Sequence, residues 1–216
     1  MNLCEKYRPR RLSEMVGQPQ AVAEIEHFIR RGKIGGRAFW FQGPPGVGKT
    51  SMAYVIGCEL GVIRDRDTLA SLKNGSNFNV QFYQSQSFDV AAANDLRNWI
   101  GSLPWPPAEY KMAVIDEAHT ITDKAQNALL SILEPVPSHA IVCLTTTDVE
   151  ASKRDAWGSR LCIVDFVPPP PLEVAKHLAT IACLETGDGA ELPYGEIIEQ
   201  AGGNIRGCVD LLDKYV

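Results

Sequence analysis

Long apolar runs, paired cysteines and an excess of positive charge are all missing from this chain. No apolar run is long enough to cross a membrane, and residues 1–8 lack the apolar core of a signal peptide. We therefore expect a cytoplasmic protein without membrane contact. The six cysteines are scattered and form no C-x-x-C pair, which excludes a zinc ribbon and a redox pair.

The charge balance limits the kinds of partner that the surface can bind unaided. The chain has 21 Lys and Arg against 26 Asp and Glu, a formal net charge of −5. This balance excludes a surface that is basic overall, so contact with nucleic acid needs a local basic stripe or help from other subunits. The length of 216 residues fits one large domain, or a medium domain with a small appendage.

One stretch has the spacing of a phosphate-binding loop. It follows the apolar segment 38–41, precedes a helix-compatible segment that starts at Ser51, and reads Gly43-Pro44-Pro45-Gly46-Val47-Gly48-Lys49-Thr50. A strand, a glycine loop and a helix in this order place backbone N–H groups and the positive end of a helix dipole around a polyphosphate. Lys49 would reach the β- and γ-phosphates, and Thr50 would ligate Mg²⁺. The sequence therefore predicts a nucleoside triphosphate site.

Short apolar runs alternate with segments of helical periodicity. The runs predicted as strands are Ala38–Phe41, Val80–Tyr83, Met112–Ile115, Ile141–Leu144 and Cys162–Phe166. The segments predicted as helices between them are Ser51–Leu60, Val90–Ile100 and Lys124–Leu133. This alternation predicts an α/β fold of βαβ units around a buried, parallel, five-stranded sheet. Trp105, in a stiff proline-rich loop before the third strand, is predicted to pack as an anchor.

Four consecutive prolines at 168–171 predict a domain boundary, because they continue neither a helix nor a central strand. We predict a nucleotide-binding core over residues 1–167 and a small all-helical lid over residues 168–216. The lid helices are expected at Leu172–Leu184, Gly195–Gln200 and Asn204–Val216. Gly202 and Gly203 would end the second lid helix, and Asn204 would cap the third.

Two carboxylates, Asp116 and Glu117, directly follow the third predicted strand. Parallel sheets bind ligands beyond the C-terminal ends of their strands, so Asp116 is expected beside the phosphate loop, where it would hold Mg²⁺. Glu117 would orient and deprotonate the attacking water. The competing interpretation is a strand that ends in two solvated acids.

Phosphoryl transfer also needs an arginine near the γ-phosphate, from the same chain or from a neighbour. Two candidates are Arg160, between the fourth and fifth predicted strands, and Arg206, in the first turn of the last predicted helix. Spacing alone does not distinguish either arginine from a solvated surface charge.

Together these landmarks resemble the AAA+ ATPases of the sliding-clamp-loader group, which includes replication factor C small subunits and bacterial polymerase III gamma/tau and delta-prime subunits. The resemblance runs over nearly the whole chain. Besides the phosphate loop and the segment 116–119, it rests on the stretches Glu5–Pro9, Val16–Gln18, Ala125–Pro135, Leu144–Asp148, Gly158–Leu161 and Gly202–Arg206.

The resemblance implies an enzyme that uses ATP and Mg²⁺, and it implies roles for the residues that match. Thr147, with Thr146 as second choice, matches sensor 1; Arg160 matches the arginine that acts on ATP held by the neighbouring subunit. Arg206 matches sensor 2, which reaches the γ-phosphate from the lid. The catalytic residues implied are Glu117, Lys49, Arg160, Arg206 and Thr147. The nucleotide contacts implied are Tyr7, Arg8, Pro9, Val16, Gly17, Gly43, Pro44, Pro45, Gly46, Val47, Gly48, Lys49, Thr50 and Ser51, with Thr50 and Asp116 on Mg²⁺.

The implied partners are other clamp-loader subunits in a homo- or hetero-oligomeric ring, a sliding clamp and primer–template DNA. The chain departs from the family pattern in three places. Leu161 replaces the cysteine that follows the motif's arginine, with Cys162 one place later. Residues 58–79 hold one cysteine where bacterial gamma subunits carry a four-cysteine zinc module, so no zinc is expected. The family's helical collar is expected to be absent, because the chain ends at Val216.

Three other interpretations fit part of the pattern. The letters of segment 116–119 suggest a DEAH-box helicase, but the chain has no room for the second RecA-like domain that such an enzyme needs. Another AAA+ DNA motor or initiator, such as a branch-migration motor, shares the core and lid but differs at the Lys-Tyr-Arg-Pro and Ser-Arg-Cys positions. A structural clamp-loader subunit without hydrolysis typically lacks the phosphate loop that this chain keeps.

Overall fold

The strands of this chain form one parallel sheet. The computed structural model describes residues 2–149, 157, 160–187 and 192–216. The strands are β1 (Arg37–Gln42), β2 (Val80–Gln84), β3 (Lys111–Asp116), β4 (Ala140–Thr146) and β5 (Cys162–Asp165). Their order in the sheet is β2-β3-β4-β1-β5. The predicted α/β fold with a parallel five-stranded sheet is confirmed, and each predicted strand is present with small shifts at its ends.

Both faces of the sheet are buried, as β1 illustrates. Phe39 and Phe41 point into one apolar cluster, while Ala38 and Trp40 point into a second cluster on the other face. This alternation follows from the two-residue period of a strand. A sheet covered on both sides needs apolar residues at its central positions, which is why the inner strands β1, β3 and β4 contain continuous apolar runs.

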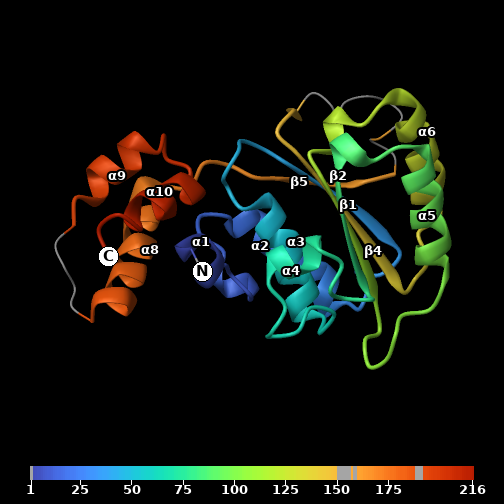
Figure 1. Cartoon of the computed structure of the whole chain (residues 1–216), viewed down its shortest axis with the longest axis horizontal. Coiled ribbons are helices and arrows are strands. Elements are labelled where there is room, and N and C mark those ends of the chain that lie inside the picture. The colour runs from blue at the N-terminus through green and yellow to red at the C-terminus, as the bar shows by residue number, and fades with distance from the viewer. Residues whose placement is uncertain (1, 150–156, 158–159, 188–191) are drawn as a thin grey trace.

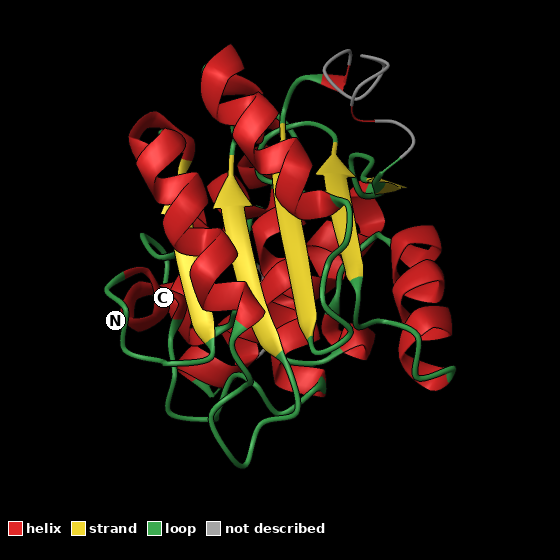
Figure 2. Ribbon diagram, turned by 90° about the vertical axis from the view of Figure 1, so that its right-hand side faces the viewer, coloured by secondary structure: helices red, strands yellow, loops and turns green. Residues whose placement is uncertain are grey.

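Helices cover the sheet on both sides (Figures 1 and 2). One face is covered by α2 (Pro19–Arg30), α3 (Lys49–Glu59) and α4 (Leu69–Lys73), and the other by α5 (Val90–Gly101) and α6 (Asp123–Leu133). Short 3₁₀ turns are η1 (Leu12–Glu14), η2 (Ser85–Ser87) and η3 (Ala118–Thr120). None of the helices in the described ranges has the length and apolar character of a membrane span.

The remaining helices form a separate lobe that is joined to the sheet by the proline segment (Figure 1). They are α8 (Pro171–Thr186), α9 (Tyr194–Gln200) and α10 (Ile205–Leu212), and the N-terminal α1 (Leu3–Lys6) packs with them around a third apolar cluster. The predicted helical lid is thus present. The exact boundary at residue 167 stays a prediction.

The proline segment is fixed to the N-terminal part of the chain. A Cβ at Gly17, whose φ is 68°, would lie 2.2 Å from the Cβ of Pro169, so this close approach requires glycine. The buried amide of Gln18 donates to the carbonyl oxygens of Val167 at 2.7 Å and Val47 at 3.3 Å. Gln18 therefore connects the phosphate loop to the segment that leads into the lid.

The prediction that Trp105 is a packed anchor is wrong, because 68% of this residue is exposed. Its loop is held instead by the side chain of Asn79, which accepts from the backbone N–H of Trp105 at 2.7 Å and donates to its carbonyl oxygen at 2.8 Å. Because Asn79 fixes the loop backbone, the indole ring is not needed to anchor it.

Candidate active site

The phosphate loop connects the end of β1 to the start of α3. Gly43 follows β1 with a φ of 146°, and a Cβ there would lie 2.2 Å from the carbonyl oxygen of Phe166, so no larger residue fits without movement. Gly48, at a φ of 106°, is the N-cap of α3. The first N–H groups of this 11-residue helix therefore adjoin the loop, where they and the helix dipole favour an anion.

Lys49 places its ammonium group inside the loop. The residue is only 6% exposed, and Nζ donates to the carbonyl oxygens of Gly43 at 2.7 Å and Pro44 at 2.6 Å. Burial lowers the pKa of Lys49, and the nearby carboxylates of Glu117 and Asp116 partly offset this effect. A polyphosphate would supply stronger, charged acceptors for the same ammonium group.

Asp116, at the end of β3, contacts Thr50 at the start of α3. Its Oδ1 accepts hydrogen bonds from Oγ1 of Thr50 at 3.0 Å and from Oγ1 of Thr145 at 2.6 Å. Mg²⁺ prefers oxygen ligands and is usually held by one or two protein groups together with waters and phosphate oxygens. The hydroxyl of Thr50 and the carboxylate of Asp116 have the chemistry and the proximity for that ion.

Glu117 occupies a backbone conformation that is rare for a residue with a side chain. Its φ is 54°, in the left-handed region, and its N–H donates to Oγ1 of Thr145 at 3.1 Å. Oε2 of Glu117 accepts from the N–H of Thr147 at 3.2 Å and from its Oγ1 at 3.1 Å. The ends of β3 and β4 thus fix both the backbone and the side chain of this carboxylate.

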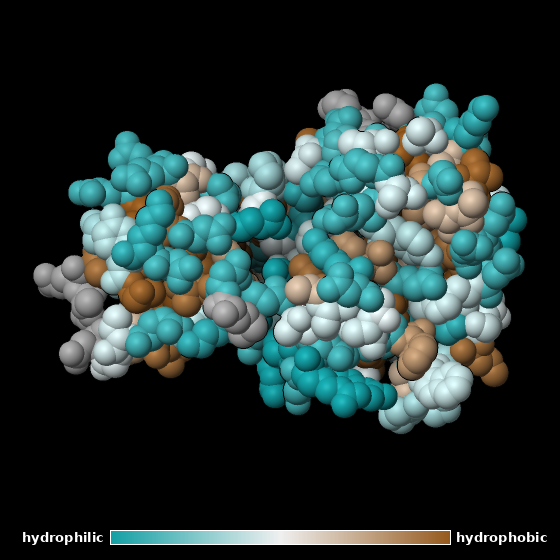
Figure 3. Space-filling view, in the orientation of Figure 1, coloured by the Kyte–Doolittle hydropathy of each residue, from teal (hydrophilic) through white to brown (hydrophobic). Residues whose placement is uncertain are grey.

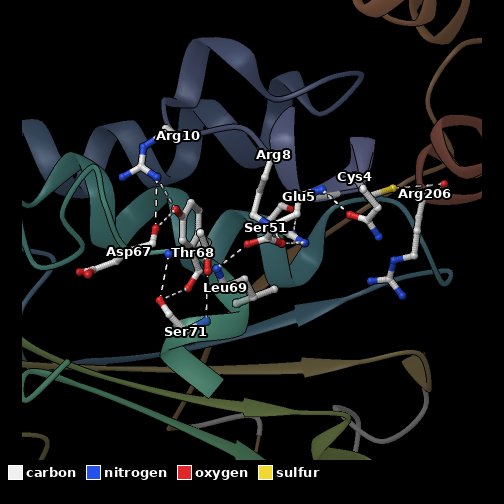
Figure 4. Close-up of polar contacts among 12 residues, drawn as sticks. Cys4, Glu5, Arg8, Arg10, Ser51, Asp67, Thr68, Leu69, Ser71 and Arg206 are labelled. Carbon is white, nitrogen blue, oxygen red and sulfur yellow. Dashed lines mark hydrogen bonds and ion pairs between the residues drawn. The ribbon is translucent and has the colours of Figure 1, made fainter. Parts of the chain in front are cut away.

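The N-terminal segment contacts the first turn of α3 through Arg8 (Figure 4). Nη1 of Arg8 donates to Oγ of Ser51 at 3.0 Å, and Arg8 forms an ion pair with Glu5 at 3.0 Å. The other carboxylate oxygen of Glu5 accepts from the N–H of Leu69 at 2.7 Å, at the start of α4. Arg8 therefore reaches the first turn of α3 from a segment distant in sequence.

The lid contributes Ile205, Arg206 and Val209 of α10 to the site. The side chain of Asn204 caps this helix by accepting from the N–H of Gly207 at 2.7 Å, as the sequence predicts. Arg206, in the first turn, lies close enough to Lys49 to contribute to lowering its pKa. On the neighbouring α8, burial lowers the pKa of His177, which favours a neutral imidazole at the cleft.

These parts enclose one cleft at the junction between the two lobes, where the molecule narrows to a waist (Figure 3). Residues of the N-terminal segment, the phosphate loop, the end of β3 and the lid all line it. They are Leu3, Cys4, Tyr7, Arg8, Pro9, Glu14, Met15, Val16, Pro45, Gly46, Val47, Gly48, Lys49, Thr50, Ser51, Asp116, Glu117, His177, Ile205, Arg206 and Val209.

Most residues predicted from the sequence therefore meet in this cleft. Three others contact residues of the cleft: Gly43 and Pro44 bind Lys49, and Thr147 binds Glu117. Gly17 packs on Pro169 and is not among the lining residues. Whether these residues contact a nucleotide stays a prediction.

Arg160 lies elsewhere: its Nε is 2.7 Å from Oε1 of Glu134, the C-cap of α6, and it is not among the residues that line the cleft. Two other residues of its predicted motif, Gly158 and Ser159, fall outside the described residues.

Several residues of the site were not predicted from the sequence. Met15, His177, Ile205 and Val209 enter the cleft from elements whose relative placement is a tertiary property. Thr145 is different, because it directly follows the fourth predicted strand, Ile141–Leu144, and precedes Thr146 and Thr147. Its position at a strand end was a usable signal, since polar residues there meet the ligand side of a parallel sheet.

Comparisons with known proteins identify relatives over most of the chain. A family model described as "DNA polymerase III, delta subunit" matches residues 17–169. The DNA polymerase III subunit gamma/tau of Mycobacterium tuberculosis H37Rv is 31% identical over 100% of this chain and 39% of its own length. Replication factor C small subunit 1 of Pyrobaculum aerophilum is 28% identical over 96% of this chain and 60% of its own length. The chain thus spans less than two thirds of either relative.

Solved structures confirm the fold. The Thermotoga maritima RuvB Holliday junction branch migration motor is similar with a TM-score of 0.67 and 20% identity, over 95% of this chain and 64% of that chain. At 20% identity, this similarity shows a shared architecture alone. It therefore does not favour a branch-migration motor over a clamp-loader subunit. The family model, in contrast, covers well over half of the chain. The chain belongs to the DNA polymerase III delta-subunit family, within the sliding-clamp-loader group of AAA+ proteins expected from its motifs.

Proposed function

We propose that this chain is an ATP-binding and ATP-hydrolysing clamp-loader subunit that helps to load a sliding clamp onto primer–template DNA during replication. One observation carries the proposal: Thr50 and Asp116 meet at 3.0 Å in the same cleft as the buried ammonium group of Lys49. An ammonium group for the phosphates, together with a hydroxyl and a carboxylate for Mg²⁺, is what a site for a triphosphate and its metal ion needs. The gamma/tau and replication factor C relatives support the clamp-loading role.

Each side chain has a distinct task in this proposal. Lys49 and the N-terminus of α3 would bind the phosphates, and Thr50 and Asp116 would hold Mg²⁺, which would offset charge on the phosphate oxygens. Glu117 orients the attacking water and accepts its proton. Arg206 contacts the γ-phosphate from the lid. Tyr7, Arg8, Pro9, Val16 and Gly17 surround the adenosine end, and Thr147 holds Glu117 in place.

The site is completed by a second subunit. Arg160 is paired with Glu134 and does not line the cleft of its own chain, which suits an arginine that serves the ATP of a neighbour. An arginine at the γ-phosphate stabilises the charge that develops during transfer. The partners proposed are therefore other clamp-loader subunits, arranged so that Arg160 of one meets the cleft of the next, together with the clamp and primer–template DNA.

The Lys49→Ala variant tests hydrolysis. Loss of a charged hydrogen bond to phosphate costs about 1.5–3 kcal/mol, so ATP affinity should fall about 10- to 100-fold and turnover should fall to background. ATP hydrolysis and ATP binding are measured for both proteins. Lys33→Ala, at an exposed lysine after α2, is the matched control and should behave as wild type. Equal turnover in wild type and Lys49→Ala would refute hydrolysis in this cleft.

A further inference from the structure

Among the described residues, the partners of the Glu117 carboxylate all lie at one of its two oxygens. Oε2 accepts both hydrogen bonds from Thr147 and also lies 3.3 Å from Nδ1 of His119. In the part of the chain that the structure describes, Oε1 has no hydrogen-bonding partner. One oxygen is therefore fixed by the protein, and the other remains available to a water.

The surroundings of His119 favour hydrogen on one ring nitrogen, Nδ1. Oγ1 of Thr146 donates to the carbonyl oxygen of Asp148 at 3.2 Å and accepts from the N–H of Asp148 at 2.9 Å. A hydroxyl has one proton, so when Oγ1 donates to Asp148, the contact between Oγ1 and Nδ1 of His119 at 3.0 Å takes its hydrogen from the ring. The nearby carboxylate oxygen of Glu117 also favours hydrogen on Nδ1, because an ionised carboxylate only accepts.

The same hydrogen on Nδ1 thus faces two acceptors, the hydroxyl of Thr146 and Oε2 of Glu117. The hydrogen bond with Thr146 fixes the imidazole ring of His119. The fixed ring then places its partly positive N–H group beside the carboxylate of Glu117. His119 is three residues after Asp116, but it contacts neither Asp116 nor Thr50 through any hydrogen bond or ion pair within the described ranges. Its effect is therefore directed at Glu117.

We propose that His119 is a positioning residue for Glu117: together with Thr147 it holds Oε2, so that Oε1 is aimed at the attacking water. The proposal rests on the proposed function, because it needs Glu117 to act on water during ATP hydrolysis. A purely structural role explains the contact less well. The side chains of His119 and Glu117 are 23% and 37% exposed, and pairs exposed to this degree contribute little to stability.

Two substitutions of His119 distinguish a positioning role from a purely structural role. His119→Ala removes the donor, while His119→Asn places an amide N–H near the position of Nδ1–H. For each full-length variant we would measure kcat and KM for ATP hydrolysis and the Kd for ATP, beside wild type, Glu117→Gln and the exposed His27→Ala control. We expect kcat of His119→Ala to fall about tenfold, less than the 10²–10⁴ of a general base itself, with Kd unchanged. His119→Asn should recover most of kcat, and His27→Ala should match wild type.

Two results would overturn the proposal. They are a wild-type kcat in His119→Ala, with or without a weaker Kd, and an equal loss of kcat in His119→Ala and His119→Asn. Failure of the proposed function itself has a different signature, because Glu117→Gln and Lys49→Ala would then turn over ATP as fast as wild type. In that case both the function and the role of His119 are refuted.

Discussion

Gly46 is the residue at which the phosphate loop meets the lid. Its φ is 73°, and a Cβ there would lie 2.5 Å from Oδ1 of Asn204 and 2.9 Å from two further atoms of that side chain. Asn204 in turn caps α10, the helix that carries Arg206. A single glycine therefore allows the lid helix to approach the phosphate loop.

We predict that Gly46→Ala destabilises the protein and weakens nucleotide binding together. A left-handed conformation costs a residue with a side chain about 1–2 kcal/mol, and the displaced Asn204 side chain would shift the start of α10. Gly101→Ala is the control, because a Cβ at Gly101 has nothing within 4 Å and no positive φ is recorded there. Urea unfolding and ATP titration measure both effects. If Gly46→Ala and Gly101→Ala have the same stability and ATP affinity, the close approach of Gly46 to Asn204 contributes to neither property.

Which site residues were predictable depends on how close they are in sequence to a motif. Lys49, Thr50 and Asp116 are specified by local patterns, because a loop, a helix start and a strand end place them together in any parallel sheet of this kind. His177 and Val209 carry no such pattern. They reach the cleft only because α8 and α10 pack in one particular orientation, which is decided by tertiary contacts of the whole lobe.

At the scale of elements, the short α1 connects the two lobes. Toward the lid, the thiol of Cys4 donates to Oδ1 of Asp210 at 3.1 Å, and Lys6 pairs with Glu185 at 2.7 Å. Burial and the carboxylate of Asp210 raise the pKa of Cys4 to about 12, so the thiol stays protonated at neutral pH. Toward the sheet, Glu5 binds Arg8 and the first N–H of α4. One four-residue helix thus holds lid and core together.

We predict that Glu5→Ala destabilises the protein by about 1–3 kcal/mol, because it leaves a largely buried arginine and a helix N–H without their acceptor. The side chains of Arg8 and Glu5 are only 16% and 17% exposed. Glu26→Ala provides the comparison, since Glu26 pairs with Arg30 at 43% and 75% exposure and should lose at most about 0.5 kcal/mol. The free energy of unfolding in urea is measured for wild type, Glu5→Ala and Glu26→Ala. Equal losses would mean that α1 does not connect the lobes energetically.

The strands and most of the longer helices were predicted, whereas α2 and the short helices were not. The inner strands β1, β3 and β4 contain continuous apolar runs because both sheet faces are covered. The helix α2 was missed although Pro19 stands at its first position and Ala21 and Ile25 are four residues apart and buried. The four-residue α1 and five-residue α4 are too short to show a helical period. They are stabilised by tertiary contacts such as those of Glu5.

At the scale of the whole molecule, residues of both lobes line the cleft. In our proposal the cleft is one half of the ATP site, and a neighbouring subunit supplies the other half. Residues from α1, the phosphate loop, β3 and α10 meet at the waist of the molecule. Arg160 lies against Glu134 at the end of α6, outside this cleft. The central claim is therefore that the chain hydrolyses ATP by combining its own cleft with Arg160 of a neighbouring copy or partner subunit.

The most direct test is the ATP turnover of Arg160→Ala within an assembly whose formation with partner subunits has been verified by size exclusion with light scattering. The exposed Arg31→Ala serves as control. An arginine of this kind contributes about 10³-fold or more to kcat, so we predict that Arg160→Ala binds ATP as wild type does, forms the same assembly and loses turnover by about that factor. Wild-type turnover by Arg160→Ala in the intact assembly would contradict the account.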